Sequence, residues 1–401
     1  MPTPASVRRR RSPAVYLRRR VAVAGLLTVL ALVAIAVVRS PGDRKPVGAD
    51  GRPGTHRPAQ HVRRLTRADP PSNLSVASAG DPGYLTVGSD PAVLPGPVLI
   101  ADKLNSRLLI VDPQGRVRWS WPRPGDLAPG QSFRIPDDAF FAPGGRYIIA
   151  TQEDDFVITV IDIATRKIVW RYGHPGVPGS GPDYVWNPDD AMLLPGGRVF
   201  SADIKNCRLI EIPYGGHALA WSEGTIGSCT HNPPAQYGSP NGMFPMPDGH
   251  FLVTEINGDW VDEIDTAGHV YWATNPPNIA YPSDSNAIGP DRYLTVDYSS
   301  PGQVLIFNRA GQAIWRWDVT SGPNELNHPS LAMALPDGDI LLNDDYNDRV
   351  IVIDPRRNRI VWQYGHDGVQ GTGPGYLDNP DGVDLLPPYS YADRYQPVAA
   401  K

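Results

Sequence analysis

The chain has 401 residues, of which 44 are proline and 40 are glycine. This amount of proline and glycine excludes long helices from most of the chain and favours many short strands joined by turns. The formal net charge of −5 is unevenly distributed, because residues 68–401 hold 22 basic and 40 acidic side chains, a net charge of −18. This acidic part argues against nucleic acid as a partner, since phosphate groups require positive charge on the protein.

The first predicted element is a single transmembrane helix or signal anchor at residues 21–38. This segment, VAVAGLLTVLALVAIAVV, has 18 uncharged apolar residues, enough to span a bilayer as a short helix. Seven arginines lie in residues 1–20, so the positive-inside rule predicts that these residues form a basic arm in the cytoplasm. A cleaved export signal is the alternative, because Ala34-Ile35-Ala36 has the shape of a cleavage site, and the protein would then be secreted. Both alternatives place the rest of the chain outside the cytoplasm.

Residues 39–95 are rich in proline, glycine, arginine and aspartate and show no sustained apolar periodicity. Such a composition is typical of a disordered tether. We therefore expect this segment to hold a folded domain near the cell membrane, on the extracytoplasmic side.

A repeated pattern built around tryptophan organises residues 96–388. Successive repeat tryptophans are separated by 51, 51, 51, 43 and 47 residues, a period typical of propeller blades. Between them recur a loop, a proline with a polar residue, an apolar run, a Pro-Asp-Gly or Pro-Gly-Gly turn, and two further apolar runs. With the tryptophan strand itself, each repeat predicts four strands, A to D. The repeat tryptophans are Trp119, Trp170, Trp221, Trp272, Trp315 and Trp362.

The predicted strands assemble into six blades that close into a ring. Sets of strands B, C and D begin at Val98, Tyr147, Val199, Phe251, Tyr293 and Ile340, and A patterns follow Pro136, Pro188, Pro240, Pro282, Pro329 and Pro380. The first B-C-D set lacks a good A strand, whereas the last A pattern has no B-C-D set after it. We therefore expect an all-β, six-bladed β-propeller in which residues 381–386 pair with residues 98–102, leaving 389–401 as a C-terminal tail. A local A strand at residues 90–93 is the alternative.

Several stretches resemble NHL-repeat propellers, among them ADKLNSRLLIVDPQGRV (101–117), NDDYNDRVIVID (343–354) and GHDGVQGTGPGYLDNPDGVDLLP (365–387). The tryptophan after the C-to-D turn is also similar to that of arylsulfotransferase-type and quinoprotein-type propellers. The resemblance implies the propeller fold across residues 96–388. It does not fix a chemistry, because propellers carry many unrelated functions.

One face of the predicted propeller is richer in loops than the other. The D-to-A and B-to-C connections share a face, and the long D-to-A connections contain His174, His231, His328 and His366 together with the off-pattern Trp186. The short turns of the other face contain His217, His250 and His269. Long loops on a rigid scaffold commonly form binding sites. We therefore expect His231, His328 and Trp186 to contact a ligand on the loop-rich face.

An acid stands at the end of almost every B strand, in the column Asp102, Gln152, Asp203, Glu255, Asp297 and Asp344. In three blades the acid begins an Asp-x-x-Asn-x-Arg motif whose arginine can pair with it, so those three acids are interpreted as structural. Glu255 and Asp297 lack that arginine and are the predicted ligand-binding acids. We predict no cofactor and no metal-ligand set, although acids around the channel leave a divalent cation open as an alternative.

The predicted function is binding of an unknown extracytoplasmic protein, glycan or small molecule by a membrane-tethered propeller. The alternative is an enzyme of the arylsulfotransferase, lyase or lactonase type, because arylsulfotransferase-type propellers use a central histidine as nucleophile. His328 and His231 are then the candidate catalytic residues. Cys207 and Cys229 are expected to form a disulfide on the loop-rich face, with two free thiols as the alternative.

Overall fold

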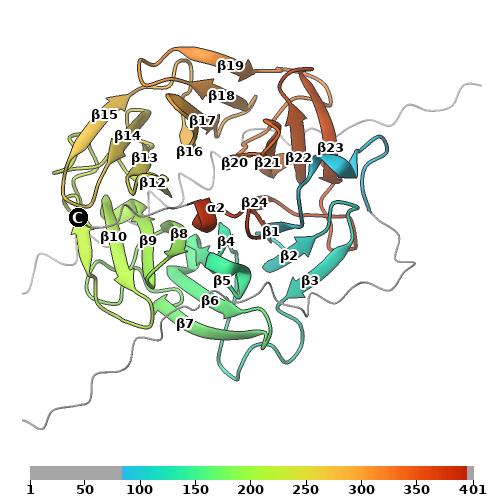
Figure 1. Ribbon diagram of the computed structural model, residues 1–401. Helices are drawn as coiled ribbons and strands as arrows, with labels where there is room; N and C mark the ends of the chain where they lie inside the picture. The colour runs from blue at the N-terminus through green and yellow to red at the C-terminus, as the bar shows by residue number, and fades with distance from the viewer. Residues whose placement is uncertain (1–83, 395–401) are drawn as a thin grey trace, which may run out of the picture. The chain divides into compact units, whose positions relative to one another are not determined.

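The computed structural model describes residues 84–394, which form six four-stranded antiparallel sheets around a central channel (Figure 1). We number these sheets as blades 1 to 6. In each blade strand A lies next to the channel, and strands B, C and D follow outward. The B strands begin within one residue of the predicted positions. The all-β, six-bladed propeller is therefore confirmed.

Each blade runs from strand A at the channel to strand D at the rim. Blade 1 consists of β24 (Pro380–Leu385), β1 (Val98–Asp102), β2 (Arg107–Val111) and β3 (Val117–Trp121), and blade 2 of β4 (Ala139–Phe141), β5 (Tyr147–Gln152), β6 (Val157–Asp162) and β7 (Lys167–Gly173). Blade 3 consists of β8 (Pro188–Leu194), β9 (Arg198–Asp203), β10 (Arg208–Pro213) and β11 (Trp221–Glu223), and blade 4 of β12 (Pro240–Pro245), β13 (Phe251–Glu255), β14 (Trp260–Ile264) and β15 (Val270–Thr274). Blade 5 consists of β16 (Pro282–Gly289), β17 (Arg292–Asp297), β18 (Gln303–Phe307) and β19 (Ala313–Trp317), and blade 6 of β20 (Ala332–Ala334), β21 (Ile340–Asp344), β22 (Arg349–Asp354) and β23 (Arg359–Gly365).

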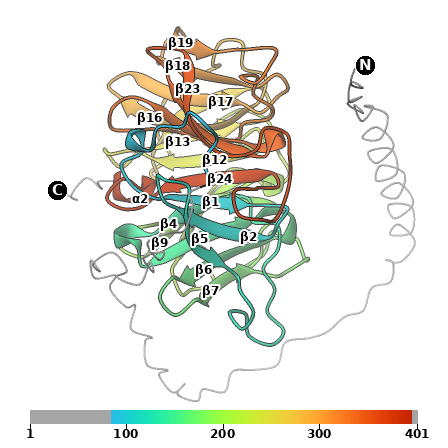
Figure 2. The same cartoon turned by 90° about the vertical axis from the view of Figure 1, so that its right-hand side faces the viewer.

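The last strand of the chain closes the ring. β24 pairs antiparallel with β1, so that Leu385 lies opposite Val98 and Pro380 lies opposite Asp102 (Figures 1 and 2). Residues 91–93 form the short 3₁₀ helix η1 (Pro91–Val93) instead of a strand. The predicted pairing of the C-terminal strand with the first blade is confirmed, and the alternative of a local A strand at 90–93 is wrong. Closure of this kind removes the free sheet edges of an open repeat array.

Two of the repeat tryptophans, Trp170 and Trp362, join neighbouring blades through hydrogen bonds. Trp170 donates its indole N–H to the Gly216 carbonyl of blade 3 (3.0 Å), and Trp362 donates to the Pro113 carbonyl of blade 1 (2.9 Å). Both acceptors lie in the C-to-D turn of the next blade, and both indole rings are buried. The indole therefore buries a large apolar area and satisfies its one donor at the same contact.

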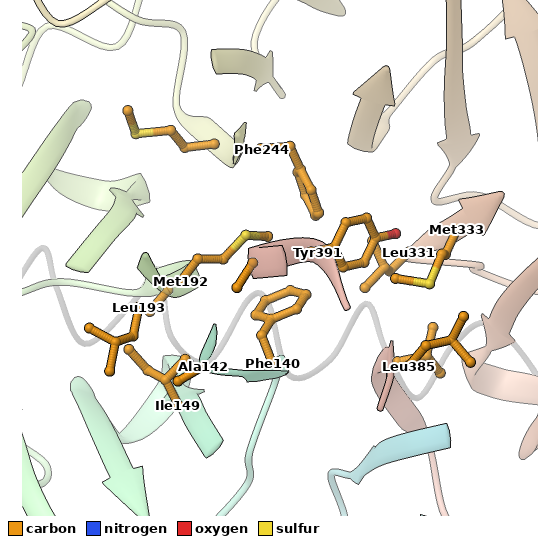
Figure 3. Packing of buried hydrophobic residues seen from close by; sticks show 14 of the residues in the cluster. Phe140, Ala142, Ile149, Met192, Leu193, Phe244, Leu331, Met333, Leu385 and Tyr391 are labelled. Carbon is orange, nitrogen blue, oxygen red and sulfur yellow. The ribbon is translucent and has the colours of Figure 1, made fainter. Parts of the chain in front are cut away.

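Apolar side chains fill the end of the channel away from the long loops (Figure 3). The short helix α2 (Tyr391–Arg394) places the Tyr391 ring near Phe140 and Phe244, with ring centroids 5.7 and 5.0 Å away. The Tyr391 hydroxyl donates to the Ala332 carbonyl (2.9 Å). We call this group of side chains around Tyr391 the aromatic plug.

The folded body extends beyond residues 96–388 at both ends. Residues 84–90 run beside the outer strand of blade 6, where Thr86 and Asp90 donate their backbone N–H groups to the carbonyls of Gln363 and Val361. At the other end, α2 belongs to the plug. Within the described range, 84–394, no helix has the length and apolar character needed to cross a membrane. The predicted basic arm (1–20), the membrane segment (21–38) and residues 39–83 of the tether lie outside the described residues.

Candidate functional site

The residue directly after each strand-A proline lies at the channel. In the six blades these residues are all polar and buried: Asp137, Asp189, Asn241, Ser283, Ser330 and Asp381. They line a cavity of about 70 Å³. We call this cavity the acidic well. Its other lining residues are Lys103, Asp138, Glu153, Tyr281, Asp284 and Tyr298.

Lys103 is the basic side chain in this set, and it comes from the B-to-C turn of blade 1. Its ammonium group forms ion pairs with Asp137 and Asp381 and lies 3.9 Å from the Glu153 carboxylate. Burial opposes the charge on Lys103, but the carboxylates of Asp137, Asp381 and Glu153 outweigh burial and raise the pKa of Lys103 well above its usual value. One lysine therefore balances part of the negative charge at the loop-face end of the well.

A second group of acids follows one residue further along strand A. One carboxylate oxygen from each of Asp138, Asp190 and Asp284 lies within 4.8 Å of the other two, and all three side chains are buried. Neither carboxylate oxygen of Asp190 has a hydrogen-bond partner among residues 84–394. In blades 4 and 1 this position is glycine. A Cβ added to Gly242 would lie 2.6 Å from Asp284 Oδ1 and 2.7 Å from Asp190 Oδ2, so a side chain there would fill the space beside the acids.

The second group is electrostatically unfavourable as three anions. Burial, followed by the charges of Asp284 and Asp138, raises the pKa of Asp190 well above its usual value. Burial raises the pKa of Asp284 to about 7. Like charges at this distance favour either protonation or a bound cation. Carboxylate oxygens are the ligands that hard divalent cations prefer, so this arrangement is suited to holding such an ion.

The acids at the B-strand ends have another role, which is to fix the long loops. Asp203 pairs with Arg208 (2.7 Å) and accepts the backbone N–H of Trp186 (2.7 Å) in the D-to-A connection. The same two kinds of contact recur at Asp102 and Asp344. The Asp-x-x-Asn-x-Arg motif predicted the pairing of each acid with its arginine.

The predicted ligand-binding acids make related backbone contacts. Asp297 accepts the N–H groups of Ala280 and Tyr281 at 3.2 and 3.0 Å. Glu255 accepts the N–H of Gly238. Neither acid lines the acidic well.

The structure brings together some of the predicted site residues and separates others. His231 Nδ1 lies 3.1 Å from Glu255 Oε1. His328 instead packs edge-on against Tyr298 and Tyr346, with ring centroids 4.9 and 4.5 Å away, and burial lowers its pKa. Tyr298 lines the acidic well, whereas neither His328 nor His231 is among its lining residues. Trp186 is 44% exposed on the loop-rich face.

Two further sequence expectations concern the loops. Cys207 and Cys229 form a disulfide, with Cα atoms 5.0 Å apart, which ties the B-to-C turn of blade 3 to the connection that follows the blade. His217, expected on the opposite face, has its Nδ1 2.8 Å from an oxygen of Asp183 in the connection between blades 2 and 3. His217 lies in the C-to-D turn of blade 3, as expected, and this contact joins that turn to the preceding connection.

Sequence reasoning misses the acids that form the well. The signal is present, because each strand-A pattern is recognised by a proline followed by a polar residue. Within a single repeat, the pattern assigns that polar residue to the loop. Nothing in one repeat indicates that six such residues, one from each blade, surround the channel. Lys103 is missed as well, although it directly follows Asp102 in the B-strand column.

Comparisons with known proteins bear on the fold. No protein-family model matches the chain, and no curated protein matches it either. Among solved structures, a protein of unknown function from Bacteroides caccae is 13% identical with a TM-score of 0.52, covering 73% of this chain and 99% of that one. A streptogramin B lyase is 14% identical with a TM-score of 0.47, covering 76% and 94%. Virginiamycin B lyase from Staphylococcus aureus is 15% identical with a TM-score of 0.45, covering 67% and 83%. At 13% identity, the similarity to the Bacteroides caccae protein supports the fold alone.

Proposed function

We propose that the chain is a membrane-tethered, extracytoplasmic propeller that binds its ligand on the loop-rich face through a divalent cation. Asp138, Asp190 and Asp284 hold this cation at the acidic well, which Asp138 and Asp284 line. The ligand is a protein, glycan or small molecule whose oxygen atoms complete the coordination of that cation. The membrane attachment rests on the apolar segment 21–38 and its flanking arginines.

The observation that carries the proposal is the state of Asp190. This side chain is fully buried, and both of its carboxylate oxygens lack a hydrogen-bond partner within the described part of the chain. An ionised carboxylate in that position is costly unless it is paired or coordinates a metal. Asp138 and Asp284 offer further oxygens within 4.8 Å, whereas the ammonium of Lys103 is already engaged by Asp137 and Asp381.

The size of the well favours an ion over an organic ligand. Its volume is about 70 Å³. Pockets for drug-sized ligands occupy roughly 300–1,000 Å³, so a molecule of that size would have to remain above the well, among the long loops. A cation with a few bound waters is consistent with the smaller volume.

The test uses the full chain in detergent, and its unfolding is followed by tryptophan fluorescence. We expect Ca²⁺ or Mn²⁺ to raise the melting temperature relative to a chelator, because an ion that binds only the folded state stabilises it by mass action. Asp190→Asn should abolish that shift, whereas Asp248→Asn, an exposed acid of the opposite face, should preserve it. Equal shifts in wild type and Asp190→Asn, or no shift in wild type, would contradict the proposal.

Membrane topology has a separate test. A reporter that is active only in the cytoplasm, fused after Lys401, should give no signal in cells, because the propeller follows a segment with a cytoplasmic N-terminus. The same reporter fused before residue 21 should be active. Activity of the C-terminal fusion would place the propeller in the cytoplasm and overturn this part of the proposal.

A further inference from the structure

Blade 4 departs from the ion-pair pattern of blades 1, 3 and 6. In blade 3 the strand ends pair Asp203 with Arg208, and in blade 4 the same register position pairs Glu255 with Trp260. The guanidinium that neutralises the acid in blades 1, 3 and 6 is therefore missing in blade 4. Glu255 needs another source of positive charge.

Blade 4 also gains an acid on the neighbouring strand. Asp262 lies two positions beyond Trp260, where blades 1, 3 and 6 carry Leu109, Ile210 and Ile351. Asp262 is fully buried, and neither of its carboxylate oxygens finds a hydrogen-bond partner among the described residues. One cation has thus been replaced by a tryptophan, and one apolar side chain by a carboxylate without a hydrogen bond.

His231 from the preceding loop faces both carboxylates. Its Nδ1 atom lies 3.1 Å from Glu255 Oε1 and 3.8 Å from Asp262 Oδ2. The imidazole stacks on the Trp260 indole with a centroid distance of 4.0 Å and an interplanar angle of 7°, so its orientation is fixed. The Gly238 N–H holds the second Glu255 oxygen. The His231 ring is therefore positioned by packing, and the Glu255 carboxylate by a backbone hydrogen bond.

We propose that His231 Nδ1, a Glu255 oxygen and an Asp262 oxygen form a transition-metal site of the Zn²⁺ class, separate from the acidic well. Donors bound tetrahedrally to one Zn²⁺ at about 2.0–2.1 Å lie about 3.3 Å from one another, and the two separations at His231 lie on either side of that value. An imidazole nitrogen with two carboxylates suits this class of metal better than Ca²⁺. Three protein donors leave the fourth position for solvent or ligand, and the His231 side chain is 21% exposed.

A second cluster with the same residue types provides a matched control. Asp248, His250 and Glu263 also offer donor atoms within 4.8 Å of one another. There, however, Glu263 already accepts hydrogen bonds from Trp272 and from Arg309 (3.0 Å). Its charge is neutralised by the arginine, so this cluster does not require a metal.

The experiment measures Co²⁺ binding by its visible absorption in the full chain in detergent, with excess Mg²⁺ present to occupy the acidic well. We expect wild type to bind Co²⁺ with a spectrum of low coordination number, and Zn²⁺ to displace it. His231→Gln and Asp262→Asn should each remove one donor of three. Because loss of even an outer-shell partner of a metal ligand costs about 10- to 100-fold, we expect Co²⁺ binding to weaken by at least that factor. His250→Gln should bind as wild type does.

Two comparisons keep the outcome clear. Asp190→Asn should retain Co²⁺ binding. The proposal for the acidic well and the proposal for this site can therefore be contradicted separately. His231 lies in a loop, and an unchanged melting temperature of His231→Gln in chelator will show that lost binding does not reflect lost folding. If wild type gives no Co²⁺ spectrum, His231 acts as an ion-pair partner of the two acids and the proposed site is wrong. Loss of binding in His250→Gln with retention in His231→Gln would also overturn it.

Discussion

The two ends of the central channel are formed by the same A strands but by opposite kinds of side chain. Near the long loops, acids such as Asp137 and Asp190 lie at or just before the start of strand A, and Lys103 supplies a counter-charge. Near the short turns the strands present aromatic and aliphatic groups, and Phe140 and Phe244 enclose Tyr391. The loop-face end therefore depends on charge compensation, whereas the other end depends on packing. A fold can concentrate unfavourable charge at a site when packing elsewhere stabilises the same strands.

Removal of both the closing strand and the plug should have the largest effect. Deletion of residues 379–401 takes away β24 and α2, which leaves β1 with an unpaired inner edge and opens the apolar end of the channel. We expect this chain not to reach a cooperative folded state, as judged by circular dichroism and thermal melting. Deletion of residues 395–401 alone is the control and should melt like wild type. Unchanged melting of the longer deletion would show that closure contributes little.

Loss of the central ring of the plug should be the next largest effect. Tyr391→Ala removes a buried aromatic ring and should cost about 3–5 kcal/mol of unfolding free energy. Tyr391→Phe keeps the ring and loses the hydrogen bond to Ala332, so its cost should be about 0.5–1.5 kcal/mol. Denaturant unfolding measures both. If the two channel ends are independent, Ca²⁺ should raise the melting temperature of Tyr391→Phe as much as that of wild type. Loss of this increase in Tyr391→Phe would show that the ends are coupled.

Substitution of Lys103 tests charge compensation at the loop-face end. Lys103→Met leaves Asp137 and Asp381 without their ammonium partner, and removal of one member of a buried ion pair costs about 3–5 kcal/mol before any relaxation. Because these acids can take up protons, we expect Lys103→Met to lose unfolding free energy at or below the lower end of that range, as measured by denaturant unfolding in chelator. Added Ca²⁺ should restore part of the lost unfolding free energy. If Lys103→Met were as stable as wild type in chelator, the lysine would not be balancing these carboxylates.

The smallest expected effect is the pH dependence that Asp284 contributes at the loop-face end. Asp284 faces Asp190, Asp138 and Asp381, and burial raises its pKa to about 7 from an unfolded value near 3.8. Its protonated form therefore stabilises the folded state at low pH, and this contribution is lost as the pH rises through about 7. In chelator the melting temperature should fall between pH 5 and pH 8, and saturating Ca²⁺ should reduce that fall. Burial also raises the pKa of Asp384, which accepts the backbone N–H of Tyr391, to about 7, so the part due to Asp284 is the part of the fall that Asp284→Asn removes.

The sequence was sufficient for the fold because every blade repeats the same local signals. Proline before strand A, glycine in the A-to-B turn and a tryptophan in strand D fix the strand order, and the unpaired first and last patterns imply ring closure. The arginine-paired acids were also predictable, since Asp203 and Arg208 lie on adjacent strands of one hairpin.

The candidate sites were not predictable in the same way, because their members come from different blades or from distant parts of one blade. Asp138, Asp190 and Asp284 meet only when three blades surround the channel. Asp262 was hidden for another reason. It occupies a position that is apolar in blades 1, 3 and 6, so the strand pattern alone gave it no role, and only its proximity to His231 reveals one.

The most direct test of a cation in the acidic well is a crystal structure of the protein grown with Mn²⁺, in which anomalous scattering locates the metal. We expect an anomalous peak bounded by Asp138, Asp190 and Asp284, with metal–oxygen distances of about 2.1–2.3 Å to at least two of the carboxylates. The same experiment on Asp190→Asn should show no peak at that position. A wild-type map without a peak among these three acids, at a Mn²⁺ concentration that saturates any thermal shift, would contradict the presence of a cation there.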